Sequence, residues 1–270
     1  MTYTAVYFEN IPEEQRGILV ALLTDIGYEG FEEEESTLKA YIPEARFDHE
    51  KFQELIRERR LSYSIDRLPD TNWNTVWESN FQPVTVSRFC HIRAGFHPPQ
   101  QDVLHEIVIT PKMSFGTGHH ATTFMMIRQM EELVLTGRRV LDFGTGTGVL
   151  AILAEKMGAT RIVAIDTDDW SIQNARENFQ QNAATRVELR QADSAAIEET
   201  VDIILANIIR QVIVDNFPLF IARLSPGGIL LLSGLLAEDE AVIMEQAAGV
   251  GLRLEKKLVQ DGWLCLRFGY

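Results

Sequence analysis

The stretch Val140–Gly148 constrains this chain of 270 residues more than any other; it reads Val-Leu-Asp-Phe-Gly-Thr-Gly-Thr-Gly. It begins as a short apolar run typical of a buried strand, and residues 149–157 then have the apolar spacing of a helix. The glycines at positions 144, 146 and 148 permit a sharp turn and let main-chain N–H groups approach a ligand. Open α/β folds bind small molecules where such strands end. The stretch therefore predicts a ligand site on a βαβ unit, although a glycine loop alone also fits a plain tight turn.

Two acids indicate the class of ligand. The dinucleotide fingerprint spaces its glycines G-x-G-x-x-G, whereas these alternate and Asp142 ends the strand. A carboxylate there repels phosphate and attracts a sulfonium or ammonium group. Asp166 ends the next expected strand, 161–166, and follows Gly144 by 22 residues, the place where an acid binds ribose hydroxyls. This loop and acid resemble those of the class I S-adenosylmethionine-dependent methyltransferases.

Composition excludes several classes of protein. With 46% hydrophobic and 24% charged residues, the chain is expected to be globular and cytoplasmic, since it shows no signal peptide and no apolar run of about 20 residues. Cys90 and Cys265 lie far apart without metal-ligand spacing, so we expect buried hydrophobes and no structural metal.

The net charge is −14, which argues against direct nucleic-acid binding because that affinity depends on basic patches. Residues 1–70 hold 16 Asp and Glu against 8 Lys and Arg, a net charge of −8, so a basic partner would be attracted to that end. The run Glu32–Glu35 fits either a solvated edge or a recognition surface. We expect a monomer.

The chain is predicted to contain two domains joined by a linker. Residues 1–68 alternate as β-α-β-β-α-β, the order of a small α+β ferredoxin-like domain with no catalytic cluster. In the linker, residues 69–83, an aromatic stripe that includes Trp73, Trp77 and Phe81 predicts a short packing helix.

Residues 84–270 are predicted to form a Rossmann-like, doubly wound α/β sheet. Strands are expected at 84–89, 91–96, 105–109, 187–191, 202–207 and 229–233, with helices at 169–181, 209–224 and 238–248 and a turn at 225–228. Strands 252–259 and 263–268 flank a Gln-Asp-Gly hairpin signal, so the last strand should be antiparallel.

A second glycine-rich stretch, residues 111–123, reads Pro-Lys-Met-Ser-Phe-Gly-Thr-Gly-His-His-Ala-Thr-Thr before an expected helix. Thr122 or Thr123 is a natural N-cap for that helix. His119 and His120 are adjacent and have no further ligands nearby, which argues against a metal site.

Together with Ala206-Asn207-Ile208, these motifs resemble closely one family, the bacterial methyltransferases of large-subunit ribosomal protein eleven, the PrmA family. The resemblance covers nearly the whole chain, and departs from the family pattern at His119 and Ala121. It implies an N-terminal domain that holds the ribosomal protein. It also implies a C-terminal domain that trimethylates lysine and N-terminal amines with S-adenosyl-L-methionine.

The resemblance places contacts to the donor on Thr123, Gly144, Asp166 and Asn207. Phe115, Thr145 and Gly146 extend that set. Asp193 is expected near the adenine, or else as a helix cap. Asn207 is the expected catalytic residue, because its amide oxygen can orient the amine, while Asp142 is expected to brace the glycine turn.

Two alternatives remain at the level of sequence. A class I methyltransferase of the same fold can act on another protein or a small molecule, since fold does not fix substrate. Outside enzymes, the chain could be a ligand-sensing module. No residue is identified as a general base.

Overall fold

The computed structural model describes residues 3–9, 11, 19–20, 22–24, 26–28, 30–34, 37–57, 61–68, 81–112 and 115–270. The chain divides into two compact units, Met1–Ser79 and Asn80–Tyr270. The predicted linker stripe at Trp73 and Trp77 lies outside the described residues, and Phe81, at its end, is buried.

The first unit contains a four-stranded antiparallel sheet in the order β2-β3-β1-β4. Its elements are β1 (Tyr3–Glu9), β2 (Gly30–Glu34), β3 (Thr37–Pro43), η1 (Glu44–Arg46), α2 (His49–Arg57) and β4 (Tyr63–Leu68). Phe8, Leu38 and Phe52 form part of a separate core, which makes this unit compact by itself. The ferredoxin-like fold stays a prediction, because much of its first helix falls outside the described residues.

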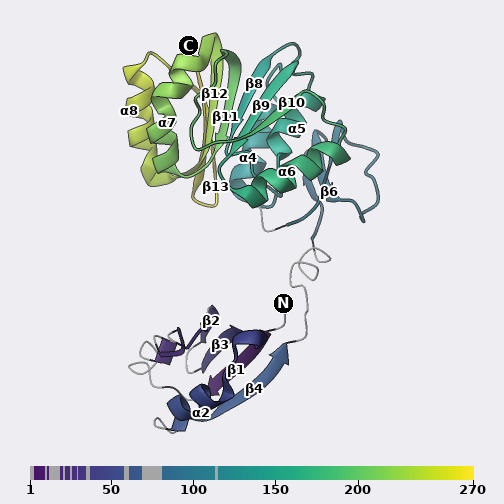
Figure 1. Cartoon of the computed structure of the whole chain (residues 1–270). Coiled ribbons are helices and arrows are strands. Elements are labelled where there is room, and N and C mark those ends of the chain that lie inside the picture. The colour runs from purple at the N-terminus through teal and green to yellow at the C-terminus, as the bar shows by residue number, and fades with distance from the viewer. Residues whose placement is uncertain are drawn as a thin grey trace. The chain divides into compact units, whose positions relative to one another are not determined.

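The second unit is built on a seven-stranded sheet in the order β10-β9-β8-β11-β12-β14-β13 (Figure 1). Its strands are β8 (Arg139–Phe143), β9 (Arg161–Asp166), β10 (Val187–Gln191), β11 (Val201–Asn207), β12 (Leu224–Leu236), β13 (Arg253–Gln260) and β14 (Trp263–Gly269). β8 to β12 are parallel to one another, whereas β14 is antiparallel to both its neighbours. The prediction of a doubly wound sheet with an antiparallel last strand is therefore confirmed.

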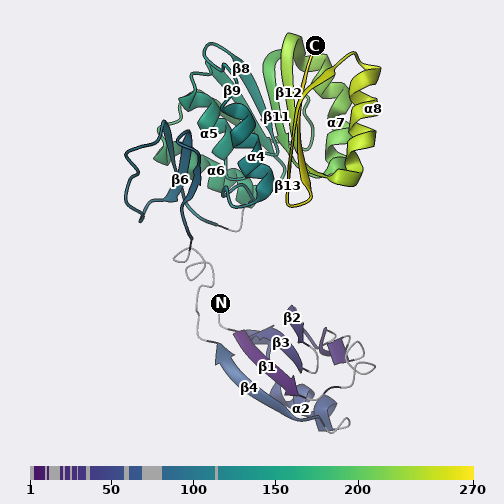
Figure 2. The same cartoon turned by 180° about the vertical axis from the view of Figure 1, so that it is seen from behind.

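Helices cover both faces of this sheet (Figures 1 and 2). α4 (Ala121–Met130), α5 (Val149–Lys156) and α6 (Asp169–Gln181) share one core cluster with it. The opposite core cluster contains α7 (Arg210–Arg223) and α8 (Glu240–Gly249), the latter preceded by η2 (Ala237–Asp239). Because the sheet is covered on both faces, its inner strands are mostly apolar; Leu205 and Ala206, for example, are both fully buried.

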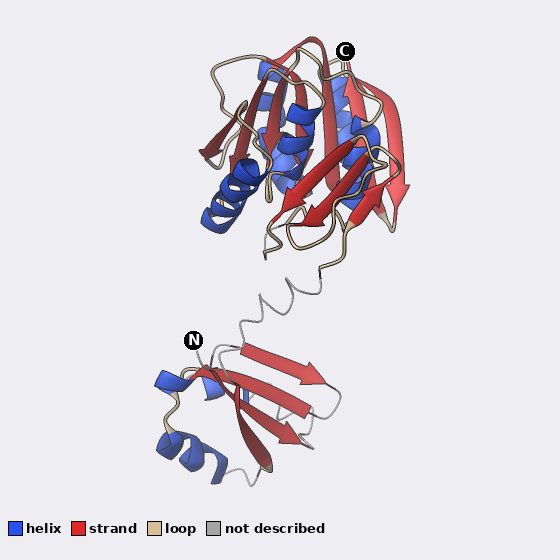
Figure 3. Ribbon diagram, turned by 90° about the vertical axis from the view of Figure 1, so that its right-hand side faces the viewer, coloured by secondary structure: helices blue, strands red, loops and turns tan. Residues whose placement is uncertain are grey.

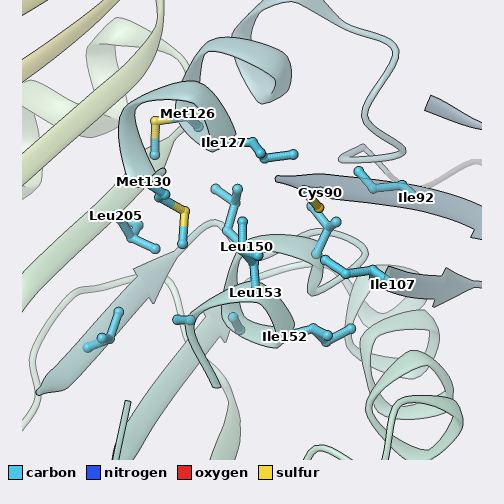
Figure 4. Close-up of a cluster of buried hydrophobic side chains, with 14 of the residues drawn as sticks. Cys90, Ile92, Ile107, Met126, Ile127, Met130, Leu150, Ile152, Leu153 and Leu205 are labelled. Atoms are coloured by element: carbon cyan, nitrogen blue, oxygen red, sulfur yellow. The ribbon is translucent and has the colours of Figure 1, made fainter. Parts of the chain in front are cut away.

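A small sheet of β5 (Val84–Val86), β6 (Cys90–Ala94) and β7 (His105–Ile109) precedes α4 (Figure 3). Its apolar face packs on α4 and α5, as Figure 4 shows for Ile92 and Ile107 beside Ile127 and Leu153. Cys90 belongs to this core, as a buried hydrophobe should, and burial raises the pKa of its thiol to about 12.

Two local predictions are wrong. The turn expected at 225–228 lies inside β12, where Gly227 adopts a φ of 72° and the register with β11 shifts. The N-cap of α4 is His120 rather than a threonine, since its ring Nδ1 accepts the N–H of Thr122 at 3.4 Å. The helix therefore starts at Ala121, and the two threonines occupy its first turn.

Candidate active site

A cavity of about 550 Å³ opens where the parallel strands end. It is lined by residues at or just after the ends of β8 to β11, by residues of β12 and β14, and by residues at and before the start of α4: Phe115, His120, Thr122, Phe143, Gly144, Gly146, Ile165, Asp166, Thr167, Ser171, Ala192, Asp193, Asn207, Ile208, Ile209, Val212, Gly234 and Trp263. A volume of this size is typical of a site for a small organic ligand.

Six of the eight predicted site residues line this cavity: Phe115, Gly144, Gly146, Asp166, Asn207 and Asp193. Thr123 and Thr145 do not line it. Thr123 is buried behind Asn207, whose Nδ2 donates to its hydroxyl at 3.3 Å. Thr145 is turned inward and donates its hydroxyl to Asp142.

The glycine loop is closed by its own hydrogen bonds. The N–H groups of Gly144 and Thr145 both donate to the Ile165 carbonyl at 2.9 Å. Gly146 donates to the Asp166 carboxylate at 2.8 Å, and Thr147 donates to the Phe115 carbonyl at 2.9 Å. The prediction that these N–H groups face the ligand is therefore wrong.

Close packing explains why glycine is needed in the loop. Gly144 and Gly146 have φ angles of 76° and 54°, in the left-handed region. A Cβ on Gly144 would collide with the side chain of Ile208, and one on Gly146 would collide with the carbonyl oxygen of Phe115. The loop thus joins the Phe115 segment to the sheet and leaves its own surface open as a wall of the cavity.

Asp142 braces this loop from beneath, as the sequence predicts. Its Oδ2 accepts the Thr145 hydroxyl at 2.6 Å and the Ala151 N–H at 3.1 Å, so one oxygen ties the loop to the first turn of α5. Burial, opposed by these hydrogen bonds and assisted by the charge of Asp166, raises the pKa of Asp142 to about 7. Asp142 does not line the cavity, so it is not the acid that faces a cationic ligand.

The acids that do line the cavity are Asp166 and Asp193, at one end of it. Asp166 is oriented by two main-chain donors, Gly146 at 2.8 Å and Asp168 at 3.1 Å. No helix begins at Asp193 in this fully described stretch, so it is not a helix cap.

Asn207 ends β11 near the middle of the sheet edge. Its Oδ1 is buried and has no hydrogen-bond partner among the described residues, although the side chain lines the cavity. A buried amide oxygen left unpaired is unfavourable by about 1–3 kcal/mol, so a hydrogen bond from a ligand N–H to this oxygen would be favourable.

His120 and Trp263 were not predicted as site residues. Trp263 begins β14, and because this strand is antiparallel its first residue lies at the edge where the parallel strands end. Ring contacts link His120 to Trp263 at 4.8 Å and to Phe115 at 5.3 Å. His119 instead packs against Phe81 at 4.9 Å and is not part of the cavity lining.

The family model for ribosomal protein L11 methyltransferase (PrmA) matches residues 8–269. The chain belongs to this family. It is 40% identical to the ribosomal protein L11 methyltransferase of Porphyromonas gingivalis, over 99% of this chain and 98% of that one. It is 41% identical to that of Chlorobaculum parvum, over 92% of this chain and 90% of that one.

Among solved structures, the chain resembles the ribosomal protein L11 methylase of Lactobacillus delbrueckii subsp. bulgaricus with a TM-score of 0.65 and 27% identity. The match covers 70% of this chain and 98% of that one. A second match, at 23% identity and a TM-score of 0.50, is a 16S rRNA methyltransferase of T. Thermophilus and shows the shared fold alone. The family and the fold make this chain a class I methyltransferase.

Proposed function

We propose that the chain transfers methyl groups from S-adenosyl-L-methionine to amines of ribosomal protein L11, both lysine side chains and the N-terminal amine. The observation that carries this proposal is the unpaired Oδ1 of Asn207 in the cavity wall. Such an atom accepts an N–H and cannot act as a nucleophile or a base. It is suited to orienting an amine, and the family's named substrate supplies amines.

The residues of the cavity fit the methyl donor. The Asp166 carboxylate would accept hydrogen bonds from the ribose hydroxyls, and Asp193 would bind near the adenine. Gly144 and Gly146, which line the cavity, would contact the donor without side chains in the way. When bound, the donor supplies a methyl group on a positively charged sulfur.

The chain's own residues align the amine with that methyl group. The nitrogen lone pair forms the new C–N bond while the C–S bond breaks and its electron pair stays on sulfur, so the two atoms must lie in line. A lysine amine has a pKa near 10.4 and must lose a proton first. The aliphatic side chains of Ile208, Ile209 and Val212 in the cavity lining disfavour the charged amine by desolvation.

His120 is not suited to remove this proton through Nδ1. That nitrogen lies 2.8 Å from the Thr122 hydroxyl and 3.4 Å from the Thr122 main-chain N–H, so it is already engaged at the start of α4. We propose that water accepts the proton.

The direct test is incubation of the enzyme with labelled donor and ribosomal protein L11. We expect label on L11, located by mass spectrometry on lysine and N-terminal amines. L11 acetylated on its amines is the matched control and should stay unlabelled. Label on the acetylated protein, or none on either, would refute amine methylation of L11.

We propose further that residues 1–68 hold the ribosomal protein in the cytoplasm, where ribosomal proteins are made. This domain has a core of its own, and residues 1–70 carry a net charge of −8. Deleting residues 1–68 should leave donor binding nearly normal and reduce methylation of L11, because docking raises the local substrate concentration. Methylation at the full-length rate by the truncated chain would exclude this role.

A further inference from the structure

Three rings form a continuous aromatic wall of the cavity, which runs from the glycine loop to the start of β14. Phe115 comes from the loop before α4, His120 caps α4, and Trp263 begins β14. The Phe115 and His120 ring planes meet at 60°, and the His120 and Trp263 planes at 70°. Rings inclined in this way leave part of their faces uncovered, and the Phe115 side chain is 51% exposed.

The strand order separates Trp263, the last ring of this wall, from the acids. Asp166 ends β9, and Trp263 begins β14, four strand positions further along the sheet. At about 4.8 Å per strand, the two positions are about 19 Å apart, while β11, which carries Asn207, is only about 10 Å from β14. Trp263 is thus next to the end of the cavity assigned to the amine, whereas Phe115 lies beside the glycine loop, where its carbonyl accepts the Thr147 N–H.

The acids contribute little to a cation at Trp263. Of the described residues that line the cavity, only Asp166 and Asp193 carry carboxylates, and Asp193 follows β10, one strand further away. Charges about 19 Å apart are largely screened at physiological ionic strength, where the Debye length is about 8 Å. Aromatic faces are then the groups able to attract a cation there.

We propose that Phe115, His120 and Trp263 bind the methylated forms of the substrate amine against their ring faces and so allow methylation to reach its last step. This proposal rests on the amine methylation proposed above. The ligand class is a substituted ammonium or tertiary amine at the end of a protein side chain or main chain.

Each methylation removes an N–H group from the amine, so Asn207 alone cannot orient the amine at every step. A neutral primary amine has two N–H groups, a methylamine has one and a dimethylamine has none. The Oδ1 of Asn207 can therefore orient the first two nucleophiles by a hydrogen bond, but not the third. The third nucleophile needs apolar contact with its methyl groups, and the charged product needs a partner that does not depend on N–H donors.

The first experiment compares the degree of methylation in the full-length enzyme and its variants. Trp263→Leu and Phe115→Leu should accumulate dimethylated L11 at the expense of the trimethylated form, whereas Trp263→Phe, which keeps a ring, should restore the final step. Asn207→Ala should instead slow the first two steps most. Mass spectrometry of intact L11 over a time course gives these distributions.

The matched control is Phe96→Leu. Phe96 is 58% exposed and contacts a histidine ring, His97, at 4.4 Å, but it is not part of the cavity lining. Its product distribution should equal that of the wild-type enzyme. Circular dichroism checks the fold of each variant. If Trp263→Leu fails to fold, the test depends on Phe115→Leu, which should fold because Phe115 is half exposed.

The second experiment separates charge from apolar contact without L11. With the demethylated donor product bound, choline should bind the wild-type enzyme more tightly than 3,3-dimethyl-1-butanol, its uncharged carbon isostere. Trp263→Leu should reduce this preference by roughly 2- to 30-fold.

Equal affinities for the two probes in the wild-type enzyme, or an unchanged product distribution in Trp263→Leu and Phe115→Leu, would overturn the proposal. A wild-type enzyme that leaves L11 unmethylated would refute the proposed function instead, and the choline comparison would still decide whether the rings bind a cation.

Discussion

Replacing Asp142 by asparagine tests whether a buried carboxylate braces the glycine loop. The pKa of Asp142 rises from 3.8 to about 7 in the folded chain. Between these values the native state holds a proton that the unfolded chain has lost, so the free energy of unfolding falls as the pH rises. This decrease in the free energy of unfolding begins above about pH 4 and is complete above about pH 7.

One pH unit in this window changes the free energy of unfolding by about 1.4 kcal/mol, so the whole effect is about 4 kcal/mol. Between about pH 5 and about pH 8, wild type should lose about 2–3 kcal/mol through this group, whereas the amide of Asp142→Asn cannot ionise. The difference in stability between variant and wild type should therefore shift by that amount in favour of the variant.

Urea unfolding at the two pH values, followed by tryptophan fluorescence, measures this shift. Asp202→Asn is the control. Burial acts to raise the pKa of Asp202, but hydrogen bonds and the charge of Arg139 outweigh it and lower the pKa. That group is ionised at both pH values, so its variant should differ from wild type by a constant amount. A constant difference for Asp142→Asn as well would refute the assignment of a buried, partly protonated carboxyl.

Three further variants test the cavity. Gly146→Ala should reduce donor affinity at least about tenfold because its Cβ would displace Phe115. Gly137→Ala is the control, since Gly137 is also in the left-handed region, at a φ of 79°, but a Cβ there would have nothing within 4 Å. Equal losses of affinity in the two variants, measured by calorimetry, would contradict the packing explanation. Asp166→Ala should weaken donor binding by about 1–3 kcal/mol, and unchanged affinity in the same titration would remove this residue from the site. Asn207→Ala should lower kcat while circular dichroism stays unchanged, and normal turnover would count against a role in orienting the amine.

The sequence predicts correctly those strands, helices and site residues whose motif lies within a short stretch of the chain. The apolar run before Gly144, the helix after it and the acid at Asp166 all lie within 30 residues, and each occupies its expected element in the structure. The start of α4 was misplaced because histidine, which is not a usual N-cap, provides the acceptor. That small difference puts Thr122 in the cavity wall and Thr123 behind Asn207.

Trp263 was missed because it is 119 residues from Gly144 in the chain and has no motif of its own. The sequence nevertheless contains the information that places Trp263 at the ligand edge. The hairpin signal at Gln260–Gly262 predicts an antiparallel last strand, and the first residue of such a strand must lie where the parallel strands end. Trp263 could therefore have been placed at the ligand edge from topology, whereas its ring contacts with His120 required coordinates.

The hydrogen bonding of the glycine loop also decides which ligands the site can accept. Phosphate-binding loops hold their ligand with several free main-chain N–H groups. Here Gly144, Thr145, Gly146 and Thr147 all donate within the protein. A phosphate would therefore find no donor in this loop, and it would also be repelled by Asp166 at the end of the next strand. Recognition must come from side chains at the strand ends and from the shape of the wall. A ligand with ribose hydroxyls, a positive charge and no phosphate meets those conditions, as S-adenosyl-L-methionine does.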